Sequence, residues 1–236
     1  MKLLAFETAT EACSVALWID GEVRERYEVA PRRHAELSLP WAEALLAEAG
    51  LRRSQLDALA VSRGPGAFTG VRLGISLVQG IALALDRPVV AVSTLAVLAA
   101  GAAPPDGRAR HVLASIDARM GEVYAGAFEW RDGGVVAIGA ESVGPAGEVE
   151  LAPAIAHWHG VGTGFAAGEN ALAHCLGARL SHVDAAALPH AGDLARLAAG
   201  AAGRGECLAP ERVEPAYLRN RVALTLAEQQ ASRQAR

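Results

Sequence analysis

A glycine-rich turn that leads directly into an apolar helix is the segment of this sequence best suited to binding chemistry. The turn reads Ser62-Arg63-Gly64-Pro65-Gly66-Ala67-Phe68-Thr69-Gly70, and a helix is predicted from Gly70 to Asp86. Because glycine lets another group approach the main chain closely, the amides of such a turn can hold a phosphate. The same turn can equally receive the backbone of a partner protein, and the sequence leaves both roles open.

A metal site is considered at His157 and His159. In a strand, these two imidazoles would lie on one face, a spacing found in metal sites. No third ligand is evident nearby in the sequence. We therefore interpret both histidines as ordinary strand residues and predict no metal.

Two other motifs fall short of a catalytic site. The run Gly160-x-Gly162-x-Gly164 lacks the six-residue fingerprint of a nucleotide-binding loop, which favours a simple strand-to-helix turn. The sequence contains no Gly-x-Ser-x-Gly elbow to present a nucleophile. We predict no catalytic residue from these motifs.

The helix predicted after the glycine-rich turn is apolar on every side. Between Gly70 and Asp86 the only charged residues are Arg72 and Asp86, and a helix without a polar face is covered by its own domain or by another protein. Its 17 residues are short for a membrane span. A helix predicted from Ala35 to Ala49 is also more apolar than one stripe requires. We therefore predict a four-helix partner interface that uses Leu37, Trp41, Leu45, Gly70, Leu73, Gly74, Leu77 and Ile81.

Composition and charge indicate a globular protein with little attraction for nucleic acid. Hydrophobic residues make up 52% of the chain, and the formal net charge is −4 without a lysine-rich or arginine-rich run. Any role near RNA is therefore predicted to be indirect. The N-terminal segment turns polar at Glu7, too early for a signal peptide, so we expect a cytoplasmic protein without a membrane contact. Three widely spaced cysteines suit reduced thiols.

Alternating strand and helix signals predict an α/β fold in two domains. A proline- and glycine-containing linker at 102–107 divides the chain into residues 1–105 and 106–236. The first domain is predicted to contain strands at 3–7, 14–19, 22–29, 56–62 and 88–92 and helices at 35–49, 70–86 and 94–102. The second is predicted to contain strands at 111–117, 122–130, 135–138 and 157–163, a short helix within 146–156, and helices at 168–176 and 191–202, the last able to return to the first domain.

Four motifs in order resemble the bacterial TsaB (YeaZ) family, whose members are paralogues of TsaD and function in tRNA threonylcarbamoyladenosine (t6A) biosynthesis. They are Phe6-Glu7-Thr8-Ala9-Thr10, Arg33-His34-Ala35-Glu36, the run from Arg63 to Arg72, and Asp117-Ala118-Arg119-Met120-Gly121-Glu122-Val123-Tyr124. The closing Glu214-Pro215-Ala216-Tyr217-Leu218-Arg219 is also similar to the C-terminal pattern of that family. The stretch from about 140 to 205 carries little of the resemblance.

The resemblance implies the two-domain fold shared by actin, sugar kinases and Hsp70. It further implies work beside the paralogous TsaD and the ATPase TsaE in making t6A, the modification next to the anticodon of tRNA. In that picture the TsaD-type partner transfers the threonylcarbamoyl group. The TsaB-type subunit is required but does not perform the chemistry.

Compared with related proteins, the metal and nucleotide motifs of this chain are incomplete. TsaD-like proteins carry His-x-x-x-His, whereas the matching place here reads His34-Ala35-Glu36-Leu37-Ser38 and lacks the second ligand. The first phosphate loop of actin-like ATPases contains glycine, which Glu7-Thr8-Ala9-Thr10 does not, and the second has glycine where Arg119 follows Asp117. We therefore expect no tightly bound cofactor. The weak nucleotide candidates are Thr8, Thr10, Asp117 and Arg119, with ATP or ADP and magnesium at a joint interface with the partners left open.

Three functions are set against one another. The first is a non-catalytic partner that binds and activates a TsaD-like enzyme together with a TsaE-like ATPase. The second is an independent ATPase or kinase of the actin-like fold that uses Glu7 and Asp117 at a magnesium nucleotide. The third is a homodimeric scaffold, and a homodimer is expected whenever the chain is alone.

Overall fold

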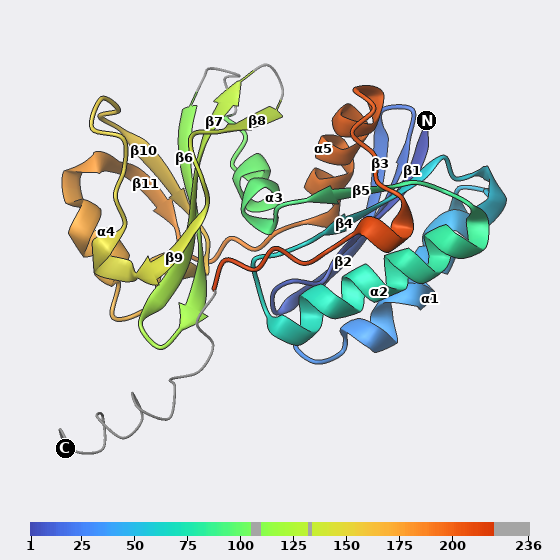
Figure 1. Ribbon diagram of the computed structural model, residues 1–236, viewed down its shortest axis with the longest axis horizontal. Helices are drawn as coiled ribbons and strands as arrows, with labels where there is room; N and C mark the ends of the chain where they lie inside the picture. The colour runs from blue at the N-terminus through green and yellow to red at the C-terminus, as the bar shows by residue number, and fades with distance from the viewer. Residues whose placement is uncertain (105–109, 132–133, 220–236) are drawn as a thin grey trace.

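Two lobes, each built on a mixed β-sheet with helices beside it, make up the computed structural model of the chain (Figure 1). The structure describes residues 1–104, 110–131 and 134–219. The predicted domain boundary at 105/106, part of the predicted linker and part of the turn predicted at 132–134 lie outside these residues.

The sheet of the first lobe has the order β3-β2-β1-β4-β5. Strand β1 is antiparallel to β2, and β2 to β3, whereas β1, β4 and β5 run parallel. The two-residue turn Asp20-Gly21 joins β2 to β3 with φ angles of 48° and 109°, the left-handed region that such hairpin turns require. The strands are β1 Lys2–Glu7, β2 Ala12–Ile19, β3 Glu22–Val29, β4 Ala58–Ser62 and β5 Val89–Val92.

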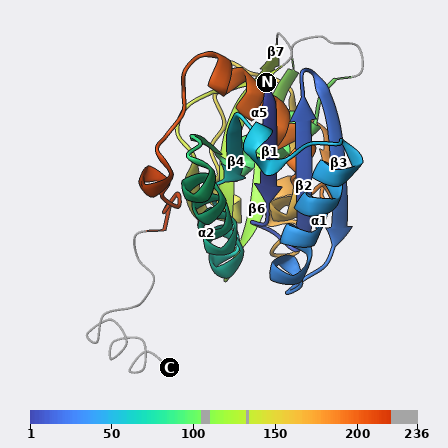
Figure 2. The same cartoon turned by 90° about the vertical axis from the view of Figure 1, so that its right-hand side faces the viewer.

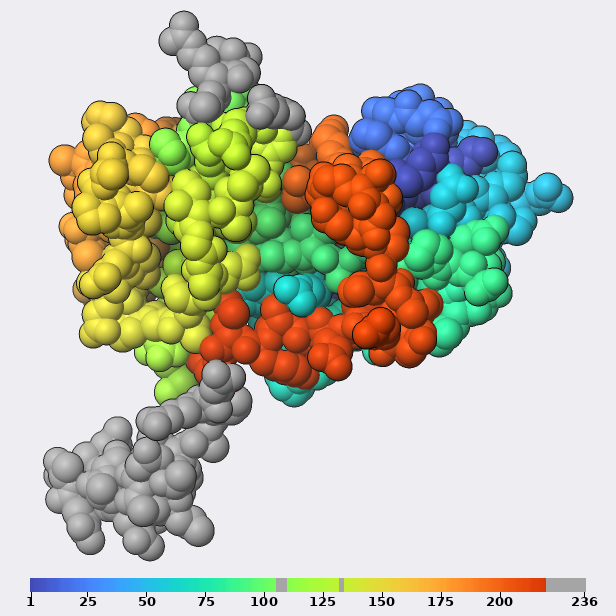
Figure 3. Space-filling model, turned by 45° about the horizontal axis from the view of Figure 1, so that its top comes forward, coloured from blue at the N-terminus to red at the C-terminus, as the bar shows by residue number. Residues whose placement is uncertain are grey.

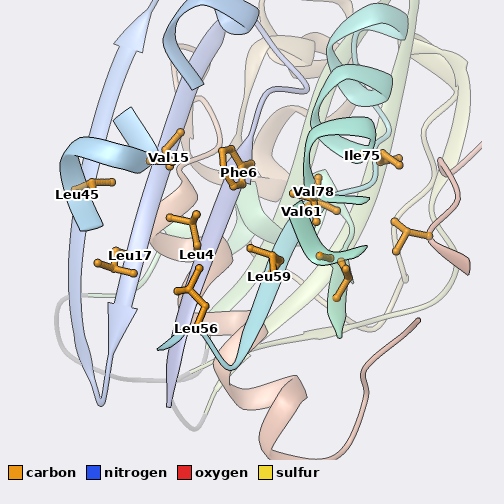
Figure 4. Packing of buried hydrophobic residues seen from close by; sticks show 14 of the residues in the cluster. Leu4, Phe6, Val15, Leu17, Leu45, Leu56, Leu59, Val61, Ile75 and Val78 are labelled. Carbon is orange, nitrogen blue, oxygen red and sulfur yellow. The ribbon is translucent and has the colours of Figure 1, made fainter. Parts of the chain in front are cut away.

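Helices cover both faces of this sheet. Helices α1 (His34–Glu48) and α2 (Phe68–Leu85) lie side by side on one face, as Figure 2 shows. Their apolar side chains meet Leu4, Phe6 and Val15 of the strands in the largest core cluster (Figure 4). By length and composition alone, α2 is the single helix in the described part of the chain that could cross a membrane. Its buried side instead packs on the sheet, as a core helix of a globular lobe does.

The sheet of the second lobe has the order β11-β10-β6-β7-β8, and β9 pairs with β7 beside β8. Strand β6 is antiparallel to β7 and parallel to β10. Trp158 and Phe165 are buried in its main core, which the short helix α4 (Ala171–Leu176) covers. The strands are β6 Arg110–Arg119, β7 Glu122–Arg131, β8 Gly134–Ala137, β9 Ser142–Pro145, β10 Trp158–Val161 and β11 Leu180–Asp184.

Two helices connect the lobes. Helix α3 (Thr94–Gly101) lies between the sheets (Figure 1). Its Leu95 and Leu98 pack in one buried cluster with Val112 of β6. Helix α5 (Ala191–Gly203) follows the second lobe in sequence but packs on the first sheet, opposite α1 and α2. The first lobe is therefore completed by a segment from the far end of the chain.

The sequence predicted the elements of the first lobe to within two residues at each end. It missed β9 and β11 in the second lobe. The helix predicted within 146–156 is only a 3₁₀ turn, Ala146–Glu148. The other 3₁₀ turns are Arg53–Gln55, Thr163–Phe165, Gly177–Arg179 and Pro210–Arg212.

Candidate partner-binding face and the covered loop beneath it

The glycine-rich turn packs against the loop that follows β1. The amide of Ala67 donates to the carbonyl of Ala9 at 2.7 Å, and the Thr8 hydroxyl donates to the carbonyl of Gly70 at 2.8 Å. A Cβ atom on Gly66 or Gly70 would overlap the carbonyl oxygens of Ala9 and Thr8. The turn therefore packs against a backbone of its own lobe, whereas the two predicted roles were binding of a phosphate or of a partner's backbone.

This packing covers the first pair of nucleotide candidates. Thr8 and Thr10 are only 1% and 6% exposed. The Thr10 hydroxyl accepts a hydrogen bond from the Ala12 amide at 3.4 Å, and the Thr8 hydroxyl is engaged with α2. In this conformation both side chains are closed to a phosphate, and the start of α2 would have to move away to open Thr8.

Glu7, at the end of β1, is completely buried. Burial raises the pKa of its carboxyl to about 7, although the hydrogen bond from the Ala9 amide, at 2.8 Å, lowers it. Its Oε2 atom has no hydrogen-bond partner among the described residues. This carboxyl therefore holds its proton to a higher pH than an exposed glutamate does.

The second pair of nucleotide candidates lies at the end of β6, next to the exposed turn that leads into β7. Asp117 accepts hydrogen bonds from the Arg119 amide at 2.7 Å and the Arg119 guanidinium at 3.1 Å. Arg119 has a φ of 68°, the left-handed conformation that glycine adopts without strain. Arginine stands here in place of the glycine of the second phosphate loop, and the backbone shows why glycine suits the position. The Thr8 hydroxyl donates to a carbonyl of α2. The Asp117 carboxylate accepts from the nearby Arg119 amide, and the Asp117 amide donates to the Thr163 hydroxyl.

Two of the histidines considered as metal ligands, His34 and His159, have other partners, and His157 lies just before β10 and not in the strand predicted for it. His34 is buried, and its Nε2 lies 3.0 Å and 3.1 Å from the carbonyl oxygens of Thr10 and Ala12, so the ring holds the loop after β1. His159 lies beside His182 of β11, with ring centroids 4.6 Å apart. No group of three potential ligands is arranged for a metal ion within residues 1–104, 110–131 and 134–219.

The predicted interface residues divide into two sets. Leu37, Leu45, Gly70 and Gly74 are buried inside the lobe, so they support the helices from beneath and do not reach the surface in this conformation. The glycines approach the loop after β1 and not a second helix, because that loop lies directly under the start of α2. The half-buried residues at the helix surfaces are Trp41, Leu73, Leu77 and Ile81.

An exposed apolar face remains on α2. Leu83 is 61% exposed, and Leu73 and Leu77 are half-buried on neighbouring helical positions. Gly80 lies among them, and a Cβ atom there would meet nothing within 4 Å. We name the face made by Leu73, Leu77, Gly80, Leu83 and Ala84 the α2 face. It lacks charge and lets another backbone approach closely at Gly80.

Known proteins share this architecture. The structure matches YeaZ from Pseudomonas aeruginosa with a TM-score of 0.83 and 47% sequence identity, over 92% of this chain and 99% of that one. A second Pseudomonas aeruginosa structure, described as similar to peptidase YEAZ, gives a TM-score of 0.85 at 48% identity, with the same coverage of both chains. The protein TsaB of Escherichia coli K12 is 43% identical over 94% of this chain and 96% of its own length. The chain belongs to the TsaB (YeaZ) family.

The chain is also similar in sequence to the TsaD family, the paralogues of TsaB. A family model described as TsaD, tRNA N6-adenosine threonylcarbamoyltransferase, matches residues 27–223. The resemblance inferred from the motifs is thereby confirmed, and the two-lobed architecture is the actin-like fold that it implied. The Escherichia coli relative is described as a tRNA threonylcarbamoyladenosine biosynthesis protein.

Sequence reasoning missed several residues at this site. Phe68 is 70% exposed and Tyr217 is 60% exposed, and the Arg72 guanidinium lies between their rings, 3.4 Å and 5.2 Å from the two centroids. The Arg72 guanidinium also donates to the Tyr217 hydroxyl at 2.6 Å. Tyr217 belongs to the C-terminal family motif, but no local signal in the sequence places it beside Arg72 of α2, 145 residues away.

Proposed function

We propose that this chain is a non-catalytic subunit in t6A biosynthesis that binds and activates a TsaD-type paralogue, together with a TsaE-type ATPase. The observation that carries the proposal is the α2 face, because an apolar helix surface left open by its own lobe is typical of a protein-binding site. Support also comes from the Escherichia coli relative, which is described by its part in this biosynthesis. Contact with tRNA would be indirect, through the partners.

The chemistry of the α2 face favours a helical partner. Leu73, Leu77 and Leu83 supply apolar contacts on neighbouring turns, and Gly80 gives room for close approach of a backbone. A paralogue of the same fold would carry equivalent helices, and two helices from each protein would form a four-helix contact. Trp41 and Ile81, half-buried on α1 and α2, would border it.

An independent ATPase or kinase is less well supported. Thr8 and Thr10 are buried and the Thr8 hydroxyl is bonded to α2, so neither side chain is open to a phosphate in this conformation. Any ATP or ADP with magnesium would then be held jointly with partner residues, with Arg119 as the exposed contribution of this chain. Calorimetric titration of the isolated chain with magnesium ATP should give no micromolar binding, and such binding would revive the enzyme hypothesis.

The deciding experiment is reconstitution of threonylcarbamoyl transfer to tRNA with each component omitted in turn. The assay contains this chain, the TsaD-type paralogue and the TsaE-type ATPase from the same cell. Activity should disappear when this chain is omitted, and the chain alone should produce none. Unchanged activity without this chain would exclude the subunit role.

A second copy of the chain is the expected occupant of the α2 face when the paralogue is absent. Sedimentation of the purified chain should show a dimer that the paralogue converts into a heterodimer. A homodimer that persists at saturating paralogue would favour the scaffold hypothesis instead.

A further inference from the structure

The C-terminal segment from Leu208 to Arg219, which we name the tie, crosses from the first lobe to the second (Figure 3). It begins beside β5, where Leu208 and Val89 exchange backbone hydrogen bonds of 2.8 Å and 2.9 Å. It ends at Arg219, whose guanidinium donates to the carbonyl of Ala118 at 3.1 Å and pairs with Glu122. Both of these acceptors belong to the β6–β7 hairpin of the second lobe.

Between these ends, the tie is held along α2. The side-chain amide of Gln79 donates to the backbone carbonyls of Pro210 and Val213 at 3.0 Å and 3.2 Å. The Val213 side chain is buried in the first-lobe core. The amide of Ala216 donates to the carbonyl of Arg63, in the glycine-rich turn, at 2.8 Å. The tie is therefore fixed to the first lobe by several contacts and to the second mainly through Arg219.

The tie also forms the border of the α2 face. Tyr217 and Phe68 enclose the Arg72 guanidinium, and both rings remain more than half exposed. Tyrosine and arginine are among the residue types enriched at the energetic hot spots of protein interfaces. A partner seated on α2 would touch the Phe68–Arg72–Tyr217 cluster. Tyr217 is only two residues before Arg219, which makes the contact to the second lobe.

We propose that the tie couples the docking of the TsaD-type paralogue on α2 to the position of the second lobe. This inference rests on the proposed function, because it takes the same paralogue as the occupant of the α2 face. Docking orders the Phe68–Arg72–Tyr217 cluster, and the short stretch from Tyr217 to Arg219 then holds the β6–β7 hairpin, which carries Asp117 and Arg119. Coupling is reciprocal, so loss of the Arg219 contact weakens docking although Arg219 lies on the second lobe.

The test compares Arg219→Ala with a matched control, Arg212→Ala, which removes the same charge from an exposed position in the same segment. The affinity of each full-length variant for the paralogue is measured by calorimetry, and amide hydrogen exchange is followed at Ala216, Tyr217 and the β6–β7 hairpin. We expect Arg219→Ala to weaken binding at least about fivefold, the lower end of typical coupling between sites. We also expect faster amide exchange at Ala216 in Arg219→Ala. The affinity of the control Arg212→Ala should stay within about twofold of that of the parent chain.

The outcomes separate the two proposals. If the parent chain fails to bind the paralogue, the proposed function is wrong, and the coupling fails with it. If the parent binds and Arg219→Ala binds equally well, only the coupling is wrong. A variant with weaker binding but unchanged exchange at Ala216 would also overturn the tie as the carrier, since Arg219 would then act by direct contact.

Discussion

Gly70 of α2 and Thr8 of the loop after β1 lie in backbone contact, with the Thr8 hydroxyl donating to the Gly70 carbonyl at 2.8 Å. A side chain on Gly70 would overlap the carbonyl oxygen of Thr8. The helix that bears the open apolar face is therefore seated directly on the loop where actin-like enzymes bind phosphate. The contact between Thr8 and Gly70 therefore covers the loop after β1 and also positions the α2 face.

Replacement of Gly70 by alanine should destabilise the fold, because the new methyl group has to displace the Thr8 backbone. Overpacking of this kind costs about 1–3 kcal/mol. Gly80→Ala is the matched control on the same helix, where a Cβ atom meets nothing within 4 Å, and it should gain about 0.5–1 kcal/mol from helix propensity. Urea unfolding of both variants measures the difference, and equal stability of Gly70→Ala and the parent chain would contradict the close packing.

The first lobe could be predicted from sequence because its signals are local. Asp20-Gly21 between two alternating segments specifies a hairpin, and Gly50 follows α1 with a φ of 64°, as a helix-ending glycine does. In the second lobe, β9 is four residues long and contains Gly144 and Pro145. It is a strand only because its backbone pairs with β7, a contact that no local pattern indicates.

The candidate site could be predicted only in part, for a similar reason. Helical periodicity shows that α2 is apolar all round, but it does not show which side the lobe covers. Gly70 and Gly74 face the loop after β1 while Gly80 faces outward, and the three glycines look alike in sequence. The contact of Tyr217 with Arg72 depends on the path of the whole chain, so the motif was visible and its role was not.

Glu7 should make the stability of the fold depend on pH. Burial raises its pKa from 4.5 to about 7, so between these values the folded state binds more protons than the unfolded state, and stability falls as pH rises. The uncharged isostere Glu7→Gln removes this penalty. It should be more stable than the parent above pH 7, by up to roughly 3 kcal/mol for a shift of this size, and the advantage should vanish below pH 4.5.

Urea unfolding of the parent and Glu7→Gln at a series of pH values checks this expectation. The control variant is Glu11→Gln, which removes a carboxylate from an exposed position near the same loop. A stability difference for Glu7→Gln that is the same at low and high pH would show that Glu7 is not the group responsible.

His190 should contribute stability that is present at low pH and lost at high pH. Its Nδ1 lies 3.3 Å from Glu25 Oε1, which also accepts a hydrogen bond from the Gly192 amide at 3.0 Å at the start of α5. The contact with Glu25 raises the pKa of His190, although burial lowers it. Burial raises the pKa of Glu25, but hydrogen bonds from His190, Ser14 and Gly192 outweigh it and leave the pKa lowered.

A histidine with a raised pKa stabilises the folded state fully below its unfolded pKa of 6.5 and loses that effect as pH rises through the folded value. The melting temperature of His190→Gln should therefore lie furthest below that of the parent at about pH 6 and approach it at about pH 9. Differential scanning calorimetry at several pH values measures the gap. A gap that stays constant would assign the role of His190 to its stacking on Tyr27, which does not require the charge.

Leu77→Asp should weaken binding of the TsaD-type paralogue about a hundredfold or more and leave the fold intact. Leu77 is half-buried on the α2 face and is absent from the core clusters, so aspartate there stays hydrated in the free chain and loses its water only on docking. An uncompensated charge in an interface costs about 3 kcal/mol or more, roughly a hundredfold in affinity. Val136→Asp is the control, since Val136 is 44% exposed on β8 of the other lobe and should bind as the parent does. Calorimetric titration gives the affinities and circular dichroism reports the fold; a folded Leu77→Asp variant that binds normally would move the partner site away from α2.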